Sequence, residues 1–243
     1  MASDPPQIPG DDLLALLPLD ILVLLLNRLF LREFLSLVLT SKKWRGVCIA
    51  EIQILHGNFR SGFMDYCFLY ECIKDFSLFQ NLTTLSGIAP PTEYEFTQNG
   101  MDRIAPNIRH LWFSYESFNL KPVVLGKFIQ LTSLHICQAT QITSFDSLAV
   151  LTKLRVLSLD RCELSDFAGL ASLTRLEVLS ISETSAYSYN GGTSEKYSQL
   201  DESLCHLTKL RSLRLYTIFT NYTYLEFLTG LLFLDLLKTV PPR

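Results

Sequence analysis

The chain reads Leu154-Arg-Val-Leu157-Ser-Leu159-Asp-Arg-Cys162, and 22 residues later it reads Leu176-Glu-Val-Leu179-Ser-Ile181. A sequence that repeats at a fixed period of this length predicts a stack of structural repeats. Leucines at the first, fourth and sixth positions place apolar side chains on one face of a short strand. A return segment facing the same core is predicted by the apolar residues that follow, Leu164, Phe167, Leu170 and Leu173.

The repeat extends in both directions from this copy. The predicted strand starts are Leu82, Ile108, Leu131, Leu154, Leu176, Leu210 and Leu231, at intervals of 26, 23, 23, 22, 34 and 21 residues. The long interval holds residues 185–199, which lack apolar periodicity and contain Asn190-Gly191-Gly192, so we expect an inserted loop there. The pattern L-x-x-L-x-L-x-x-C resembles the short class of leucine-rich repeat. This resemblance implies an α/β solenoid with a curved parallel sheet on its concave side.

A different pattern precedes the repeats. Apolar residues follow helical spacing at Leu17, Ile21, Leu22, Leu25, Leu26 and Leu29. Pro18 stands in the first turn of this helix, where proline is tolerated. A second helical stretch is predicted from about Glu33 to Ser41. Together these segments predict a small helical bundle near the lower size limit for independent stability.

The ungapped stretch from Leu17 to Arg45 resembles an F-box. It opens with Leu17-Pro18-x-Asp20, begins its second helix with Glu33-Phe34 and ends with Ser41-Lys42-Lys43-Trp44-Arg45. An F-box at about 15–50 followed by repeats is the order found in F-box/leucine-rich-repeat proteins. The resemblance implies a substrate-recognition subunit of an SCF-type cullin-RING ubiquitin ligase. It implies docking on a SKP-type adaptor, and through it on a cullin, by Leu17, Pro18, Ile21, Leu22, Leu25, Leu29 and Trp44.

These patterns divide the chain into four parts. We expect a disordered tail over residues 1–13 and the F-box helical bundle over 14–55. A connecting and capping helical segment is expected over 56–80, with Tyr66 to Phe79 as its cap. The leucine-rich-repeat solenoid is expected over 81–243.

Composition restricts the expected partners. The 21 basic and 24 acidic residues give a net charge of −3, which disfavours nucleic acid and anionic membrane surfaces. Charged and polar residues interrupt the leucine-rich stretch from Leu13 to Leu39, so we expect no membrane-spanning helix. The six cysteines lack paired C-x-x-C spacing, which argues against a zinc site or a disulfide framework. We therefore expect a cytoplasmic or nuclear protein that needs no metal or cofactor.

The residues between the inward leucines are expected to face outward on the concave side. The middle row is Trp112, His135, Ser158, Ser180, Arg214 and Asp235, and the next is Ser114, Cys137, Asp160, Ser182, Tyr216 and Leu237. Aromatic and arginine side chains dominate the energetics of protein interfaces. We therefore predict that a protein target binds through Trp112, His135, Asp160, Arg161, Arg214 and Tyr216. For Trp112, packing against residues 86–105, which include Tyr94 and Phe96, is the alternative.

Two other functions stay open at this point. The chain can be a leucine-rich-repeat scaffold outside any ligase, such as a phosphatase or cytoskeletal regulator, whose N-terminal helices only cap the solenoid. More remotely, His135, Ser158 and Asp160 are the residue types of a hydrolase triad. No G-x-S-x-G turn accompanies them, so we expect no enzymatic activity.

Overall fold

The computed structural model of the protein describes residues 18–29, 49, 51–56, 75–88, 93–114, 122–137, 145–162, 167–183, 200–216 and 223–236. Several expectations lie outside these ranges. They concern the tail over 1–13, Leu17, the second F-box helix with Trp44, most of the segment 56–80 and the inserted loop 185–199.

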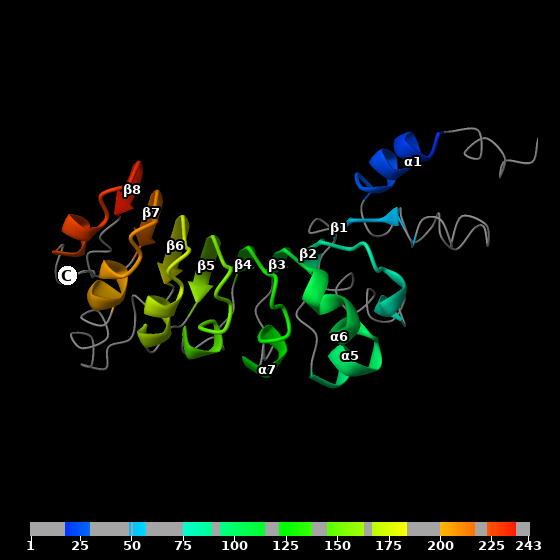
Figure 1. Ribbon diagram of the computed structural model, residues 1–243, viewed down its shortest axis with the longest axis horizontal. Helices are drawn as coiled ribbons and strands as arrows, with labels where there is room; N and C mark the ends of the chain where they lie inside the picture. The colour runs from blue at the N-terminus through cyan, green and yellow to red at the C-terminus, as the bar shows by residue number, and fades with distance from the viewer. Residues whose placement is uncertain are drawn as a thin grey trace, which may run out of the picture.

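Eight parallel strands form one sheet in the order β1-β2-β3-β4-β5-β6-β7-β8 (Figure 1). They are β1 (Ile54–His56), β2 (Thr84–Ile88), β3 (His110–Ser114), β4 (Ser133–Cys137), β5 (Val156–Cys162), β6 (Val178–Glu183), β7 (Ser212–Tyr216) and β8 (Phe233–Leu236). Each strand from β2 to β8 begins two residues after its predicted start. The repeat register is therefore confirmed, and the described chain is an α/β leucine-rich-repeat solenoid.

The alternation of side chains explains why the strands form one face of a core. In β4, Leu134 and Ile136 are buried while Ser133, His135 and Cys137 are half-buried. In β5, Leu157 and Leu159 are fully buried. Because side chains of a strand point alternately to the two faces of the sheet, every second residue is left on the opposite, outer face.

The return segments are short because their apolar residues recur every three positions. Phe167, Leu170, Leu173 and Leu176 are linked by three successive backbone hydrogen bonds, in which each N–H donates at 3.0 Å to the carbonyl three residues earlier. Three residues per turn is the geometry of a 3₁₀ helix, so one face of the segment remains apolar along its length. This segment contains η5 (Ala168–Ser172).

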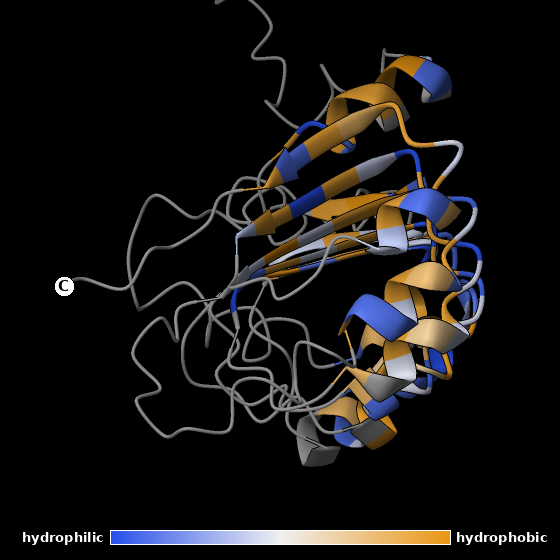
Figure 2. Cartoon of the chain, turned by 90° about the vertical axis from the view of Figure 1, so that its left-hand side faces the viewer, coloured by the Kyte–Doolittle hydropathy of each residue, from blue (hydrophilic) through white to orange (hydrophobic). Residues whose placement is uncertain are grey.

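The other return segments have the same character or contain short helices. They are η2 (Phe76–Leu78), α5 (Glu93–Gln98), α6 (Met101–Ile104), η3 (Ala105–Asn107), α7 (Pro122–Leu125), η4 (Phe145–Ser147) and η6 (Thr223–Phe227). Residues 200–205 are also helical. Figure 2 shows the strands in one layer and these segments in a second layer on one side of it. The core lies between the two layers.

A backbone hydrogen-bond motif recurs at every junction between strands. One carbonyl just before each strand from β1 to β7 accepts the N–H groups of two consecutive residues in the next repeat. Arg155, for example, accepts from Glu177 at 2.8 Å and from Val178 at 3.0 Å. Within the described ranges the accepting residues are Gln53, Thr83, Arg109, Thr132, Arg155, Glu177 and Arg211. Each repeat is thereby held in a fixed register on the previous one.

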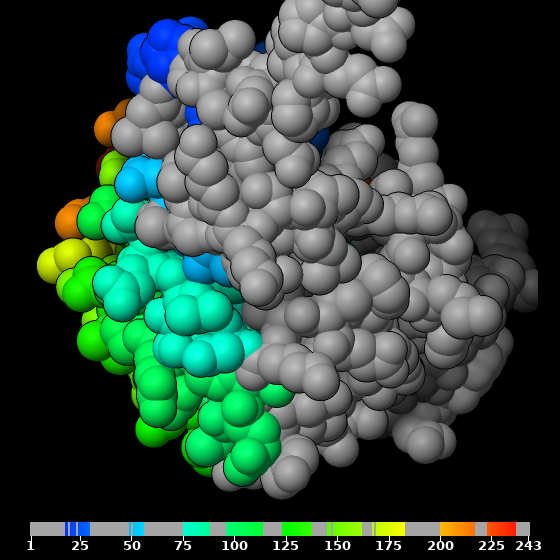
Figure 3. Space-filling model, turned by 90° about the vertical axis from the view of Figure 1, so that its right-hand side faces the viewer, coloured from blue at the N-terminus to red at the C-terminus, as the bar shows by residue number. Residues whose placement is uncertain are grey.

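The sheet begins one strand earlier than the repeat pattern predicted. β1 pairs in parallel with β2, and Ile52 and Leu55 are buried in the common core. The helix α1 (Leu19–Leu26) packs at this end through Leu22 and Leu26, which are 3% and 1% exposed. Figure 3 views the molecule from this end, with α1 in blue beside the cyan residues that include β1.

Asn27, just after α1, completes the junction motif at the first strand. Its side-chain Oδ1 accepts the backbone N–H groups of Gln53 at 2.9 Å and Ile54 at 3.0 Å. These two residues are the counterparts of the N–H pair that donates to one carbonyl at every later junction. The Asn27 side chain thus takes the place of the carbonyl that an earlier repeat would supply, and it joins α1 to the sheet.

Close stacking of η4 on η5 yields a testable prediction at Gly169. A Cβ atom at this position would lie 2.5 Å from both the carbonyl carbon and the oxygen of Phe145. We predict that Gly169→Ala lowers the free energy of unfolding by about 1–3 kcal/mol, because two backbone segments must move apart. Equilibrium denaturant unfolding measures the change.

Gly230→Ala is the matched control, because its Cβ would meet only the Leu210 carbonyl oxygen at 3.8 Å. We expect this control to change stability by less than about 0.5 kcal/mol. Equal stability of the two variants would contradict the close packing of these return segments.

Candidate functional site

The outer face of the sheet carries the side chains that the sequence predicted to bind a target. Hydrogen-bond register brings them into rows that cross the strands: Trp112 lies opposite His135, His135 opposite Ser158, and Ser180 opposite Arg214. Trp112 is 47% exposed, so it belongs to this face and not to the core. Phe96 of α5 is buried and packs edge-on against Phe128 on the other side of the sheet. The alternative in which Trp112 packs against Phe96 is therefore wrong, and the part of it that concerns the Tyr94 side chain lies outside the described residues.

Trp112 and His135 form the first group on the outer face. Their ring centroids are 5.9 Å apart and their planes are tilted by 46°. Burial lowers the pKa of the His135 imidazole, and the nearby His110 lowers it further. At neutral pH this group is therefore an uncharged aromatic surface, suited to apolar or aromatic side chains of a partner.

Cys137, Asp160 and Arg161 lie in the middle of the sheet. The Cys137 thiol donates a hydrogen bond to Asp160 Oδ2 at 3.3 Å. Burial and this contact with the carboxylate raise the pKa of the Cys137 thiol to about 11. The thiol is thus a poor nucleophile, because the thiolate is the reactive form.

Arg161 is exposed at the end of β5 and has a φ of 54°, which is unusual for a residue other than glycine. It stands at an irregularity in the β5–β6 pairing, between Asp160 and Cys162. Such positions cost backbone energy and are concentrated at functional sites. The bulge sets the direction in which the Arg161 side chain leaves the sheet.

Arg214 and Tyr216 form a second group with two residues of β8. Asp235 Oδ2 accepts hydrogen bonds from Arg214 Nε at 3.2 Å and from the Tyr216 hydroxyl at 2.8 Å. The Arg214 guanidinium carbon lies 6.0 Å from the centroid of the Tyr216 ring and 5.6 Å from that of Phe233. The hydrogen bond to Asp235 raises the pKa of the Tyr216 hydroxyl. Phe233 and Asp235 are not among the predicted target-binding residues, although Asp235 belongs to the predicted middle row.

The Trp112–His135 group and the Arg214–Tyr216 group lie on opposite sides of a stretch of the outer face, which we call the floor. Trp112 is on β3 and Arg214 on β7, four strand spacings or about 19 Å apart. The floor between them carries Cys137 and Asp160 together with six small side chains, Ser133, Val156, Ser158, Val178, Ser180 and Ser182. Six extended residues span about 20 Å, so a short peptide segment can reach both groups.

α1 presents a second surface at the end of the solenoid. Ile21, Leu24 and Leu25 are 43%, 55% and 44% exposed, and Pro18 is also exposed. The expectation that Leu22 is presented with them is wrong, because Leu22 packs into the core. Leu29 is half-buried against the same core. The exposed apolar stripe is therefore Ile21, Leu24 and Leu25 of α1 together with Pro18, which directly precedes the helix.

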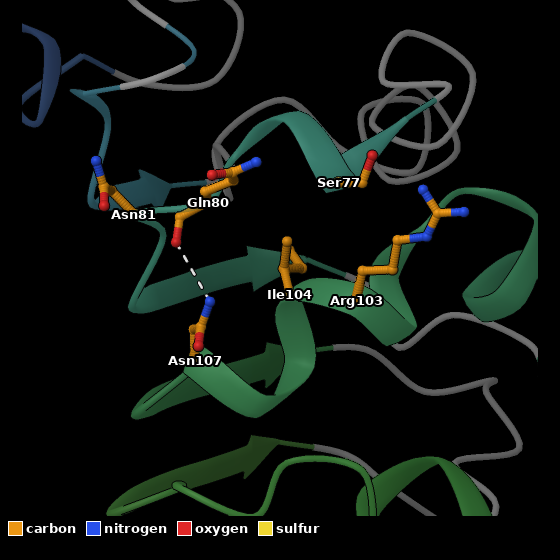
Figure 4. Close-up of a pocket in the computed structure, with 6 residues that line it drawn as sticks. All are labelled: Ser77, Gln80, Asn81, Arg103, Ile104 and Asn107. Carbon is orange, nitrogen blue, oxygen red and sulfur yellow. Dashed lines mark hydrogen bonds between the residues drawn. The ribbon is translucent and has the colours of Figure 1, made fainter.

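A polar hollow that sequence reasoning did not predict lies between η2 and the α6–η3 segment (Figure 4). Its volume is about 520 Å³, and its lining residues are Ser77, Gln80, Asn81, Arg103, Ile104 and Asn107. The Asn107 side-chain amide donates to the Gln80 carbonyl at 3.3 Å and closes one side of the hollow. The lining comes from two return segments, so the hollow is separate from the outer face of the sheet.

Among the described residues there is neither a cluster of metal ligands nor a membrane-spanning helix. No group of three His, Cys, Asp or Glu side chains is placed to hold a metal ion. No helix in the same ranges is long and apolar enough to cross a membrane.

No protein-family model and no curated protein sequence matches the chain. Solved structures do match. A leucine-rich-repeat protein of Leptospira interrogans, LIC12759, has a TM-score of 0.47 and 17% identity over 78% of this chain and 50% of its own. The PEPR1–AtPEP1 complex has a TM-score of 0.44 and 20% identity over 79% of this chain and 25% of the other.

A third similar structure is the TLR13–ssRNA13 complex, with a TM-score of 0.39 and 16% identity over 79% of this chain and 33% of the other. The chain thus spans half or less of the length of these three structures. At these levels of similarity, the assignment to the leucine-rich-repeat fold rests on the strand order and the repeating junctions described above.

The hydrogen bond between Cys137 and Asp160 predicts that the Cys137 thiol reacts slowly with alkylating reagents. At pH 8 a thiol with a pKa of about 11 is ionised to about one part in a thousand. We predict that alkylation of Cys137 by iodoacetamide, followed by peptide mass spectrometry, accelerates with pH until about pH 11. Asp160→Asn removes the negative charge that disfavours the thiolate, so it lowers the pKa and speeds the reaction at pH 8.

Asp20→Asn on α1 is the control, because it makes the same chemical change at an exposed aspartate that is distant from Cys137 in the sequence. It should leave the Cys137 rate unchanged. Equal rates for wild type and Asp160→Asn would show that Asp160 does not control this thiol.

Proposed function

We propose that this chain is the substrate-recognition subunit of an SCF-type cullin-RING ubiquitin ligase in the cytoplasm or nucleus. The observation that carries the proposal is the ungapped F-box-like stretch from Leu17 to Arg45, placed directly before leucine-rich repeats. In this proposal the chain does no chemistry of its own. It raises the local concentration of target lysines near an enzyme bound elsewhere in the assembly.

The stripe of Pro18, Ile21, Leu24 and Leu25 supports adaptor docking. Three of its side chains are large, apolar and more than two-fifths exposed, and they lie on one short helix. Contiguous exposed apolar surface on a helix is typical of a site that a partner covers. The adaptor is therefore proposed to contact Ile21 and Leu25, while Leu22 packs the helix against the solenoid core.

The outer face supports binding of a protein target. It combines the aromatic group of Trp112 and His135 with the arginine-centred group of Arg214 and Tyr216, and both stand on paired strands. Rigid aromatic and arginine side chains lose little conformational freedom on binding, so they make efficient anchors. Asp160 and Arg161 provide charges between the two groups.

A leucine-rich-repeat scaffold outside any ligase is the second candidate, and one observation favours it. Leu22 and Leu26 lie in the solenoid core and Asn27 completes the first junction, so α1 has a structural role as a cap. A cap needs no adaptor. The two candidates differ in whether the exposed side of α1 also binds a partner.

Affinity capture of the full chain from cells, followed by mass spectrometry, tests the ligase. Wild type should recover a SKP-type adaptor and a cullin, and Leu25→Asp should reduce their recovery at least about tenfold because it places a charge in an apolar interface. Leu232→Asp, the same substitution at an 82% exposed leucine on the other end of the solenoid, is the matched control. Adaptor recovery that Leu25→Asp does not reduce would contradict the docking surface.

A variant with Trp112→Ala and Arg214→Ala should show the reverse pattern in the same experiment. It should retain the adaptor and lose the target proteins that wild type recovers, since the two surfaces are at different places on the fold. Recovery of a phosphatase without any adaptor or cullin would favour the scaffold.

A further inference from the structure

The Arg214 side chain is held in one orientation while its terminal nitrogens are left available. Its Nε is occupied by Asp235, and its guanidinium plane lies near the rings of Tyr216 and Phe233. Its side chain is 46% exposed. Within the described part of the chain, neither of its two terminal nitrogens donates a hydrogen bond. A guanidinium fixed in this way presents a planar fork of donors, which matches the geometry of an oxyanion.

Two serine hydroxyls stand beside this fork. In the β6–β7 pairing, Ser180 lies opposite Arg214 and Ser182 lies opposite Tyr216. Both serines are half-buried on the outer face, and in the described ranges neither hydroxyl bonds to another residue. Neighbouring strands are about 4.8 Å apart, so donors from the two strands can reach one bound group.

Arg155 serves as a comparison, because its guanidinium group is hydrogen-bonded in a different way. Its Nε donates to Glu177 Oε1 at 2.9 Å, and one of its terminal nitrogens binds the same oxygen. The guanidinium is thus engaged through two nitrogens by a carboxylate of the next repeat. Arg214 differs because only its Nε donates a hydrogen bond to Asp235, and 46% of its side chain is exposed.

We infer that Arg214, Ser180 and Ser182 form a recognition site for a single oxyanion of the target. The group is a carboxylate of an acidic side chain or a phosphoryl group of a phosphorylated one, since both present oxygens with the spacing that the fork binds. This inference rests on the proposed binding of a target to the outer face, and it adds the chemical class of the residue recognised there.

Asp160 determines where on the floor the oxyanion lies. Asp160 is opposite Ser182 in the β5–β6 pairing, on the side away from Tyr216. Its negative charge repels an anion, so the bound group is displaced towards Ser180 and Arg214. Removal of this charge should therefore strengthen binding, which is a change in the opposite direction from the loss of Arg214.

Titration of the full chain with sodium phosphate or sodium acetate, at ionic strength held constant with sodium chloride, tests the site by NMR. The Arg214 Nε–H signal and the backbone amide signals of Ser180 and Ser182 should shift and saturate. Arg214→Gln should weaken the apparent affinity at least about tenfold, because the charged fork is lost. Asp160→Asn should strengthen it.

Arg155→Gln is the matched control, because Arg155 is an exposed arginine already engaged by Glu177. It should leave the affinity for either anion unchanged. Tighter binding of acetate identifies a carboxylate in the target, and tighter binding of phosphate identifies a phosphoryl group.

Shifts in wild type that do not saturate, or that are as large at Arg155 as at Arg214, would overturn the inferred site. This result is independent of the capture experiment. If the oxyanion site is absent, the outer face can still bind a target by other contacts. Loss of target capture in the Trp112→Ala and Arg214→Ala variant tests target binding alone, because it does not report the charge of the residue recognised.

Discussion

The carbonyl shared between successive repeats is the constraint on which the rest of the fold depends. From Gln53 to Arg211, each of these carbonyls accepts two consecutive N–H groups from the repeat that follows. This pairing fixes the register of the strands, and the register decides which side chains are buried and which lie on the outer face. The short 3₁₀ return segments keep the repeats close enough for the motif to recur, and Gly169 is where that closeness leaves no room for a side chain.

Asn27 extends this constraint beyond the sheet. Its side-chain oxygen takes the acceptor position at the first strand, while Leu22 and Leu26 enter the same core as Ile52 and Leu55. The helix proposed to bind the adaptor is thus part of the solenoid that carries the proposed target site. A receptor built in this way would hold its target at a fixed distance from the adaptor, as transfer of ubiquitin to nearby lysines requires.

Leucine spacing was sufficient to predict the strands, because an inward side chain is needed at each repeat whatever its neighbours are. It could not predict β1, whose Ile52-x-x-Leu55 pattern stands 30 residues before Leu82 and beside the helical pattern. Nor could helical spacing separate buried Leu22 from exposed Leu25, since both lie on an almost wholly apolar helix. The repeat register did place Arg214 beside Asp235 in the middle row. The hydrogen bonds of Arg214 and Tyr216 to Asp235 Oδ2 could not be predicted, because they depend on side-chain conformations that leucine spacing does not define.

Hydrogen–deuterium exchange of the Gln53 and Ile54 amides tests this account most directly. If Asn27 replaces a repeat carbonyl, these amides should exchange in wild type as slowly as those of Thr83 and Thr84, which donate to the Gln53 carbonyl. In Asn27→Ala they should lose that protection, while Asn27→Asp, which keeps an acceptor oxygen, should retain most of it. Gln53 and Ile54 amides that exchange at the rate of an unfolded peptide in wild type, or that are equally protected in Asn27→Ala, would contradict the account.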